Sequence, residues 1–488
     1  MNSEPTPVHS SLPGYAPPSI PQYGDEKGSV PLLPGQAAVY PGYNTMQQYY
    51  PADIVPQHRS RARMLFARAV HALMLLVVVA LLIPALVRGV GHVSRAIGWS
   101  HDFSAEALLV PQECTRVAQW VSRDAVPHFE WPNSIIEGGN YDHHYAVQAS
   151  VNLPVDSDVL YFISKGSMSH GLLNIADDGN VDAKSIKVDI TFVYDHEEDL
   201  DLAKVCLLQP EEGHNGVGIF TPPRHPHRRH HSHGPAFIVQ VHLPVSSSSL
   251  LKISDFRTDM PLFFHTVSDL SNSVYFKSLL LHTSNTGIKA ESIAADVANL
   301  KTSNSVIFGN FSVHDSLQLE SHNAPIVANV TLFNSGEGQV TEVSMQTSNG
   351  YIHSNVSLVA ETKGNTGGKF NVVARSSNSP VDVKFDAAPI DSVLHVDVHT
   401  SNSPARLTLD PTYEGSFSLH TGAWFPTTVQ QLNEDEEDPA GKDRKRILEL
   451  RTIRRGSTEG SVAWTPSERE ELGTAVLTSS NSPVALYL

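Results

Sequence analysis

Basic residues are scarce in this chain. Its 488 residues include 34 lysines and arginines against 51 aspartates and glutamates, which gives a formal net charge of -17. Nucleic acid binding needs a concentrated basic surface, so we expect no nucleic acid partner. The sequence also lacks the G-x-S-x-G elbow of hydrolases, the phosphate-binding loop and the H-E-x-x-H zinc motif. These absences leave no motif that predicts a catalytic centre or a cofactor.

One long segment is both uncharged and strongly apolar. Residues 69–87, AVHALMLLVVVALLIPALV, contain no Asp, Glu, Lys or Arg, and about 20 such residues span a bilayer as a helix. We therefore predict a transmembrane helix; a buried core helix is the alternative. The basic segment 59–68 contributes Arg59, Arg61, Arg63 and Arg68, against Arg88 and Arg95 on the far side. This asymmetry predicts a single-pass protein of the plasma membrane or secretory pathway, with a cytoplasmic N-terminus and a lumenal or extracellular C-terminus.

Cysteine is nearly absent, and the two that occur, Cys114 and Cys206, follow the predicted anchor. On the oxidising side of a membrane they could form a disulfide, which would contribute about 4 kcal/mol on the chain-entropy estimate. Two buried free thiols are the alternative. Three N-glycosylation sequons, at Asn310, Asn329 and Asn355, also follow the anchor, and none precedes it. The cysteines and sequons agree with the predicted orientation.

The first 58 residues are rich in proline and tyrosine and have few aliphatic residues in any periodic pattern. Such a segment cannot bury enough apolar surface to offset its ordering entropy, so we expect residues 1–58 to be a disordered cytoplasmic tail. LPGY at Leu12 resembles a WW-domain ligand, and YNTM at Tyr43 resembles a sorting signal. WW domains and sorting adaptors are therefore candidate partners, and a solvated tail without partners is the alternative.

A connecting region, residues 88–139, precedes segments with alternating apolar residues, such as SIKVDITFVY from Ser185 and AFIVQVHLPV from Ala236. This period of two predicts strands, so residues 140–260 are interpreted as an all-β, sandwich-like unit. Its residues 222–235, PPRHPHRRHHSHGP, contain the weak metal-ligand candidates His225, His227, His230, His231 and His233. Imidazole binds zinc or copper, but the interleaved arginines oppose a cation. The pattern therefore favours a solvated histidine-rich loop over a metal site.

The sequence repeats Thr-Ser-Asn between apolar runs, as in LKTSNSVIFGN from Leu300 and HTSNSPARL from His399. The central asparagines are Asn285, Asn304, Asn323, Asn349, Asn378, Asn402 and Asn481. The first six are 19 to 29 residues apart, which is too long for one hairpin turn and suits one coil of a β-solenoid. When coils stack about 4.8 Å apart, these asparagines can form a hydrogen-bonded ladder in a partly buried site. Residues 261–488 are therefore predicted to be a β-solenoid.

An antiparallel meander or sandwich throughout is the competing interpretation, because Asn-Gly pairs such as Asn349-Gly350 also form hairpin turns. It predicts turn signals about every 8 to 12 residues, and these occur between some copies. The stretch NEDEEDPAGKDRKRILELRTIRRG, residues 433–456, interrupts the repeats with adjacent acidic and basic blocks. It is predicted to be a solvated, charged insertion.

The serial TSN copies, preceded by VHLP at Val241, resemble the adhesin-like β-solenoid domain of unknown function found in bacterial and fungal surface proteins. The resemblance covers about residues 235–488. The layout of a Pro/Tyr-rich tail, one anchor and an ectodomain is similar to that of uncharacterised single-pass proteins of basidiomycete fungi. The resemblance implies a fold and a place at the cell surface, and it carries over no catalytic residue.

Two functions from different classes follow from these patterns. One is a non-enzymatic surface protein whose adhesin-like ectodomain contacts cell-wall glycan, matrix or a surface protein of another cell. The other is a carbohydrate-active β-helix enzyme, which would need paired carboxylates facing a cleft. The acidic candidates within the repeats are Asp382, Asp386, Asp391 and Asp397. No clustered set of lysines or arginines accompanies them, so we favour the non-enzymatic protein.

Overall fold

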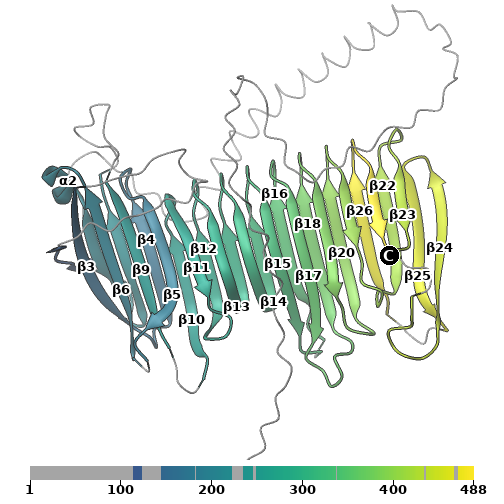
Figure 1. The fold of residues 1–488 in the computed structure, drawn as a ribbon, viewed down its shortest axis with the longest axis horizontal. Coiled ribbons are helices and arrows are strands. Elements are labelled where there is room, and N and C mark those ends of the chain that lie inside the picture. Colours follow the sequence, from purple (N-terminus) through teal and green to yellow (C-terminus); the bar gives the residue numbers. More distant parts are fainter. Residues whose placement is uncertain are drawn as a thin grey trace, which may run out of the picture. The chain divides into compact units, whose positions relative to one another are not determined.

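A computed structural model describes residues 114–123, 144–181, 183–222, 235–245, 249–336, 338–432, 436–466 and 471–488. These residues form 27 β-strands and one short helix, α2 (Glu197–Leu202). The predicted all-β class is therefore confirmed. Figure 1 shows the strands lying side by side along one axis, in nearly the order of the sequence.

Several predicted features lie outside the described residues. They are the tail 1–58, the basic segment 59–68, the transmembrane helix 69–87, most of the connecting region 88–139, and the five histidines within 222–235. Among the residues that the structure describes, no helix is long and apolar enough to cross a membrane.

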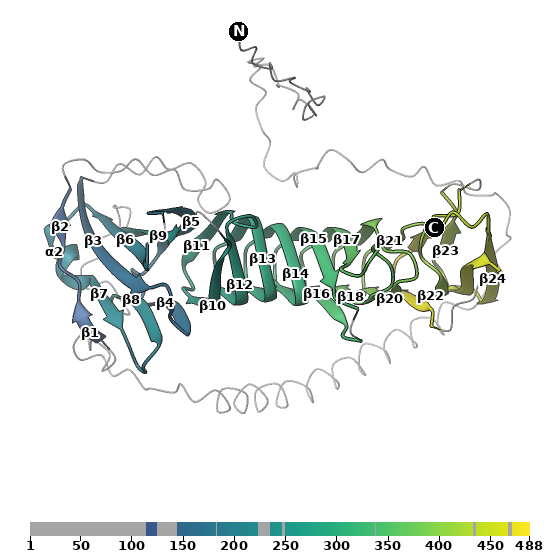
Figure 2. The ribbon, with the colours of Figure 1, turned by 90° about the horizontal axis from the view of Figure 1, so that it is seen from below.

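The strands pair in two continuous series, which form two layers facing each other across the core (Figure 2). In pairing order, the first layer contains β2 (Val121–Ser122), β3 (Tyr145–Pro154), β6 (Ser185–Tyr194), β9 (Ala236–Pro244), β5 (Gly171–Gly179), β11 (Phe263–Asp269), β13 (Ile288–Lys301), β14 (Ile307–Glu320), β15 (Ile326–Asn334), β17 (Ile352–Ala360), β19 (Val381–Ala387), β21 (Ala405–Thr408), β27 (Val484–Tyr487) and β23 (Thr427–Gln430).

The second layer contains β1 (Cys114–Val117), β7 (Lys204–Leu208), β8 (His214–Phe220), β4 (Val159–Lys165), β10 (Leu251–Asp259), β12 (Val274–His282), then β13 and β14 again, β16 (Thr341–Thr347), β18 (Lys369–Ser376), β20 (Val393–Thr400), β26 (Gly473–Ser479), β22 (Gly415–Thr421), β25 (Ser457–Thr465) and β24 (Lys445–Arg454). Strand β13 belongs to both layers because its first residues pair with β11 and its last residues pair with β12. Strand β14 does the same with β15 and β16.

From β10 to β21, all the pairings between neighbouring strands are parallel, with most residues in strict register. Each turn of the chain adds one strand to each layer, so residues one coil apart lie directly on one another. The alternative of an antiparallel meander throughout is therefore wrong for this part. Stacking also explains why position 350 is a glycine, because a Cβ there would lie 1.9 Å from the carbonyl oxygen of Ala324 in the preceding coil.

The core between the layers consists of apolar columns that run along the stack. One column contains Ile288, Ile307, Ile326, Ile352, Val381, Ala405 and Val484, each no more than 1% exposed. Alternate residues of each strand point inward, and β-branched side chains fit this pleated, crowded position. Burial of each isoleucine or valine contributes about 1.5–3 kcal/mol, so the columns hold neighbouring coils together.

The first described strands differ from the coils because they pair antiparallel. Strands β3, β6 and β9 form one antiparallel group, and β1, β7 and β8 form another. The groups pass into the parallel stack through β5 and β4, which pair with β11 and β10. Strands on both sides of residue 260 thus share the same two layers and one apolar core.

The charged insertion 433–456 contributes to the sheet, which corrects the prediction that it is only a solvated excursion. Its last part is β24, which pairs antiparallel with β25, and β25 pairs with β22. Before the strand, the side chains of Arg444 and Asp438 are 9% and 2% exposed and form an ion pair of 2.9 Å. Hydrogen bonds from Arg444 hold the pKa of Asp438 well below its usual range. Part of the acidic and basic block is therefore packed and paired.

Candidate binding surface

In each Thr-Ser-Asn corner, the first residue is buried and the third is exposed. Thr302 is fully buried, and its hydroxyl donates to the backbone oxygen of Thr286 in the preceding coil at 2.8 Å. Ser376 and Thr400 occupy the same position and donate to the oxygens of Gly350 and Ser379. A hydroxyl at this position satisfies a backbone carbonyl that the bend removes from the ladder of strand hydrogen bonds. The first residue of the motif therefore fixes one coil on the next.

The third residue of the motif forms a continuous ladder of amides. Each side-chain Nδ2 donates to the Oδ1 of the preceding coil, at 2.7 Å in five steps and 2.8 Å in the last. The members are Asn285, Asn304, Asn323, Asn349, Asn378, Asn402 and Asn481, all of them exposed. The prediction of a partly buried site is therefore wrong, because the buried member of each corner is the threonine or serine. We call these seven residues the asparagine ladder.

A second row of amides lies on the first layer. Asn329 donates to Asn310 at 2.8 Å, and Asn355 donates to Asn329 at 3.3 Å. Asn310 itself donates to the backbone oxygen of Glu291 at 2.6 Å. These are the asparagines of the three sequons, so each candidate glycosylation site lies directly beside the next one. Their modification stays a prediction.

The sequence contained a signal for this second row. Asn310, Asn329 and Asn355 each lie six positions after a member of the asparagine ladder, namely after Asn304, Asn323 and Asn349. Two rows with the same intervals must stack in the same way. The shared interval of six residues therefore predicts a second row beside the asparagine ladder.

One network of titratable side chains joins successive coils. Tyr275 donates to the Asp296 carboxylate and lies 3.0 Å from Nδ1 of His314, whose Nε2 lies 3.3 Å from Glu361. The His314 ring also stacks on Phe333, with centroids 5.0 Å apart. Burial, followed by the bond to Asp296, raises the pKa of Tyr275 above its ordinary value. Because these groups already bond to one another, the network stabilises the coils and offers no free nucleophile.

The acidic residues proposed for catalysis do not converge. Asp382 and Asp386 lie on β19 of the first layer, where they face His353 at 3.9 Å and Lys384 at 2.6 Å. Asp397 lies on β20 of the second layer and pairs with Arg375, while Asp391 lies in the turn between these strands. The carboxylates are thus divided between outward faces that point in opposite directions. Within the described ranges, no group of three or more His, Cys, Asp or Glu could hold a metal ion.

The two cysteines form a disulfide between β1 and β7, with Cα atoms 5.4 Å apart. Cys206 is fully buried, and the bond joins residues 92 positions apart. Nearby, a hollow of about 680 Å³ is lined by residues of β1, β2 and β3, including Arg116 and Gln148, and by Arg123, which follows β2. Its neighbours in sequence, residues 124–143, lie outside the described part of the chain. The disulfide therefore fixes the first described strand, β1, to β7.

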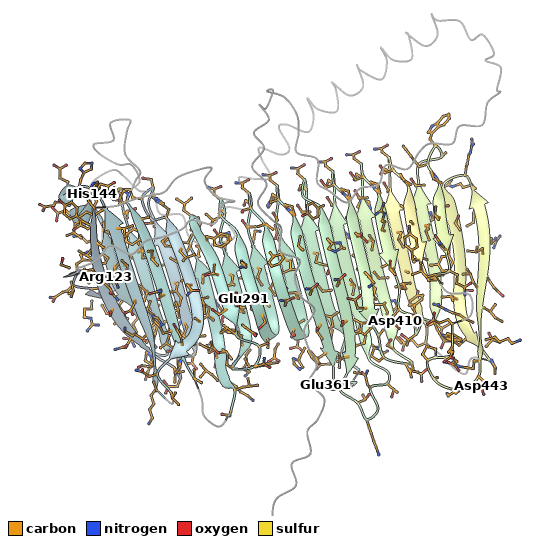
Figure 3. The ribbon with its side chains drawn as sticks, viewed as in Figure 1. Arg123, His144, Glu291, Glu361, Asp410 and Asp443 are labelled. Atoms are coloured by element: carbon orange, nitrogen blue, oxygen red, sulfur yellow. A yellow bond between two sulfur atoms is a disulfide. The ribbon has the colours of Figure 1, made fainter. Side chains whose placement is uncertain are left out.

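Figure 3 shows the side chains along the whole stack, with Glu291, Glu361 and Asp410 distributed over different coils. The outward positions of the parallel strands alternate with the buried ones and form rows. On the second layer, one row contains His282, Lys301, Glu320, Gln346, Arg375 and His399. Lys301 and Glu320 form an ion pair of 3.0 Å within it. The surface of the stack is therefore a set of parallel polar rows with mixed charge.

No family model matches the chain, and neither does any curated protein. A proposed cell adhesion protein from Clostridium sporogenes ATCC 15579 is 8% identical, with a TM-score of 0.16 over 70% of this chain and 98% of that one. A proposed adhesin from Bacteroides fragilis NCTC 9343 is 7% identical, with a TM-score of 0.22 over 70% and 96%. A proposed adhesin from Parabacteroides merdae ATCC 43184 is 12% identical, with a TM-score of 0.18 over 53% and 92%. Because these scores are low, only this chain's own geometry can support a function.

Proposed function

We propose that residues 261–488 form a β-solenoid, and that the chain is a non-enzymatic, adhesin-like surface protein. The solenoid is the rigid outer part of a single-pass protein anchored through residues 69–87, with the N-terminus in the cytoplasm. It contacts cell wall, matrix or another cell, as in the fungal surface proteins that the sequence resembles. The tail, residues 1–58, connects the protein to WW domains or sorting adaptors.

The observation that carries this proposal is the in-register parallel stacking from β10 to β21, which β26 and β27 continue. It repeats the ladder asparagine once per coil, at the strand spacing of about 4.8 Å. A partner with its own repeat, such as a wall polymer, can then form the same weak contact many times. Many weak contacts on one rigid support add to a strong attachment by effective concentration.

The enzyme alternative has less support. A glycosidase needs two carboxylates facing one substrate, and Asp382 and Asp397 lie on opposite layers. Asp382 also has His353 beside it, 3.9 Å from its carboxylate. The acidic residues of the repeats are better explained as partners of neighbouring cations on a solvated surface.

The test is adhesion by the full chain. Cells of a non-adherent host that display the protein should attach to coats of wall polysaccharide or matrix, and host cells without the protein should not. Polymer recovered from the coat should keep its length. If the cells attach to no coat and no cell type, the proposed function is refuted. If the polymer is shortened by the unchanged protein and by Asp386→Ala, but not by Asp382→Ala, the protein is a carbohydrate-active enzyme instead.

A further inference from the structure

We propose that the end of the asparagine ladder at Asn481, together with the exposed indole of Trp424, binds neutral saccharide chains. This inference rests on the proposed surface function and names the ligand class for one site on it. Trp424 is 89% exposed, whereas large aromatic side chains normally bury most of their area. An exposed ring of this size is a candidate anchor for a partner.

The turn that carries Trp424 lies on the turn that carries Asn481. Strands β22 and β26 pair in parallel, with Thr421 beside Ser479. The Thr421 hydroxyl donates to the Ser482 oxygen at 2.6 Å, and a Cβ on Gly422 would lie 2.6 Å from the Ser480 oxygen. The corner that follows Asn481 in the stack therefore offers an aromatic ring in place of another amide.

The asparagine ladder has a direction, and its two ends differ chemically. Every amide after Asn285 donates to the coil before it, so the dipoles of the ladder align and polarise one another. Asn481 is the last member, and in the described part of the chain its Oδ1 accepts no hydrogen bond from another amide. That oxygen is a strengthened acceptor in solvent, beside the turn of the exposed indole. At the opposite end, Asn285 presents N–H groups instead.

This pair of groups suits a sugar ring better than the other classes of ligand. A pyranose presents an apolar C–H face, which can stack on an indole, and hydroxyl groups at its edge, which donate to an amide oxygen. No charged side chain belongs to the corner turn GAWFP, residues 422–426, or to SNS, residues 480–482. The nearest charges are basic, because Arg454 and Arg455 precede Gly456, which packs against Gly422. The net charge of -17 nevertheless opposes a polyanion, and neither the indole nor the amide oxygen needs a charged ligand. The ligand class is therefore a neutral, β-linked saccharide with flat C–H faces.

The site can be tested by calorimetric titration of the full chain in detergent micelles with oligosaccharides of β-linked glucose and of β-linked N-acetylglucosamine. Trp424→Ala should weaken binding about tenfold, since a stacked aromatic contact and its buried area are lost. Asn481→Leu should weaken it about fivefold through loss of the acceptor. Trp424→Phe should retain part of the affinity. The matched control is Asn285→Leu, the same change at the other end of the ladder, which should bind within about twofold of the unchanged protein.

Three results would overturn the inference. They are no binding of either saccharide series by the unchanged protein, equal affinity in Trp424→Ala, or an equal loss in Asn285→Leu and Asn481→Leu. Binding of an acidic polymer or of a matrix protein at Trp424, without the neutral saccharides, would also overturn it. If the displayed chain still adheres to cells or matrix in any of these cases, the proposed function stands and only the saccharide site falls.

Discussion

Replacing Thr302 by valine should destabilise the stack more than any change in the exposed asparagine ladder. Valine keeps the shape of the fully buried side chain but removes the hydroxyl that donates to the Thr286 oxygen at 2.8 Å. That oxygen then lies in a buried corner without this donor, which costs about 1–3 kcal/mol. Asn304→Leu removes two bonds of 2.7 Å, but Asn304 is exposed and water replaces them. Its cost should stay within about 0.5 kcal/mol.

The assay is hydrogen exchange of the full chain, followed for the amides of β13 and β14. A stack of coils opens locally, so exchange reports the loss where it occurs. Each kcal/mol lost should accelerate exchange about fivefold. Thr302→Ser is the control, because it keeps the hydroxyl and should exchange nearly as the unchanged protein does. If Asn304→Leu accelerates exchange more than Thr302→Val, the exposed amides and not the buried hydroxyls hold the corners, and the reasoning is refuted.

Three further predictions concern other parts of the chain. Burial lowers the pKa of His265 from 6.5 to about 4, so between these pH values the unfolded chain binds a proton at His265 that the folded chain does not bind. The free energy of unfolding should therefore fall by about 3 kcal/mol as the pH drops from 6.5 to 4, and its slope against pH should flatten in His265→Gln. Cys206→Ser should lower the free energy of unfolding by about 4 kcal/mol, because the bond to Cys114 closes a span of 92 residues. Thermal unfolding measures this loss, and a loss below about 1 kcal/mol would contradict the chain-entropy estimate. In sealed vesicles with the cytoplasmic face inside, a tag at Met1 should resist protease while a tag at Leu488 is digested; the opposite pattern would reverse the predicted orientation.

Much of the repeated corner could be predicted from the sequence, because it is a local pattern. The interval between asparagines sets which residues meet when the chain returns to the same corner. The alternation of apolar residues in Ile307–Glu320 shows which side chains point inward. The exposure of Asn304 could not be predicted, since it depends on how closely the turn approaches the coil before it. That approach is made by Thr302, whose hydroxyl needs the Thr286 carbonyl beside it.

The sequence by itself determined the class of strands, the length of one coil and the residues that form the asparagine ladder, because neighbouring coils are related by a short, repeated step along the chain. Only the tertiary structure decided the order of the last strands. Strand β26 lies between β20 and β22, so Asn481 donates to Asn402 across 79 residues, and the corner with Trp424 comes after both. No local pattern specifies that insertion, since it depends on β25 pairing with β22 on one edge, with β24 beyond it, and leaving the other edge of β22 free for the end of the chain.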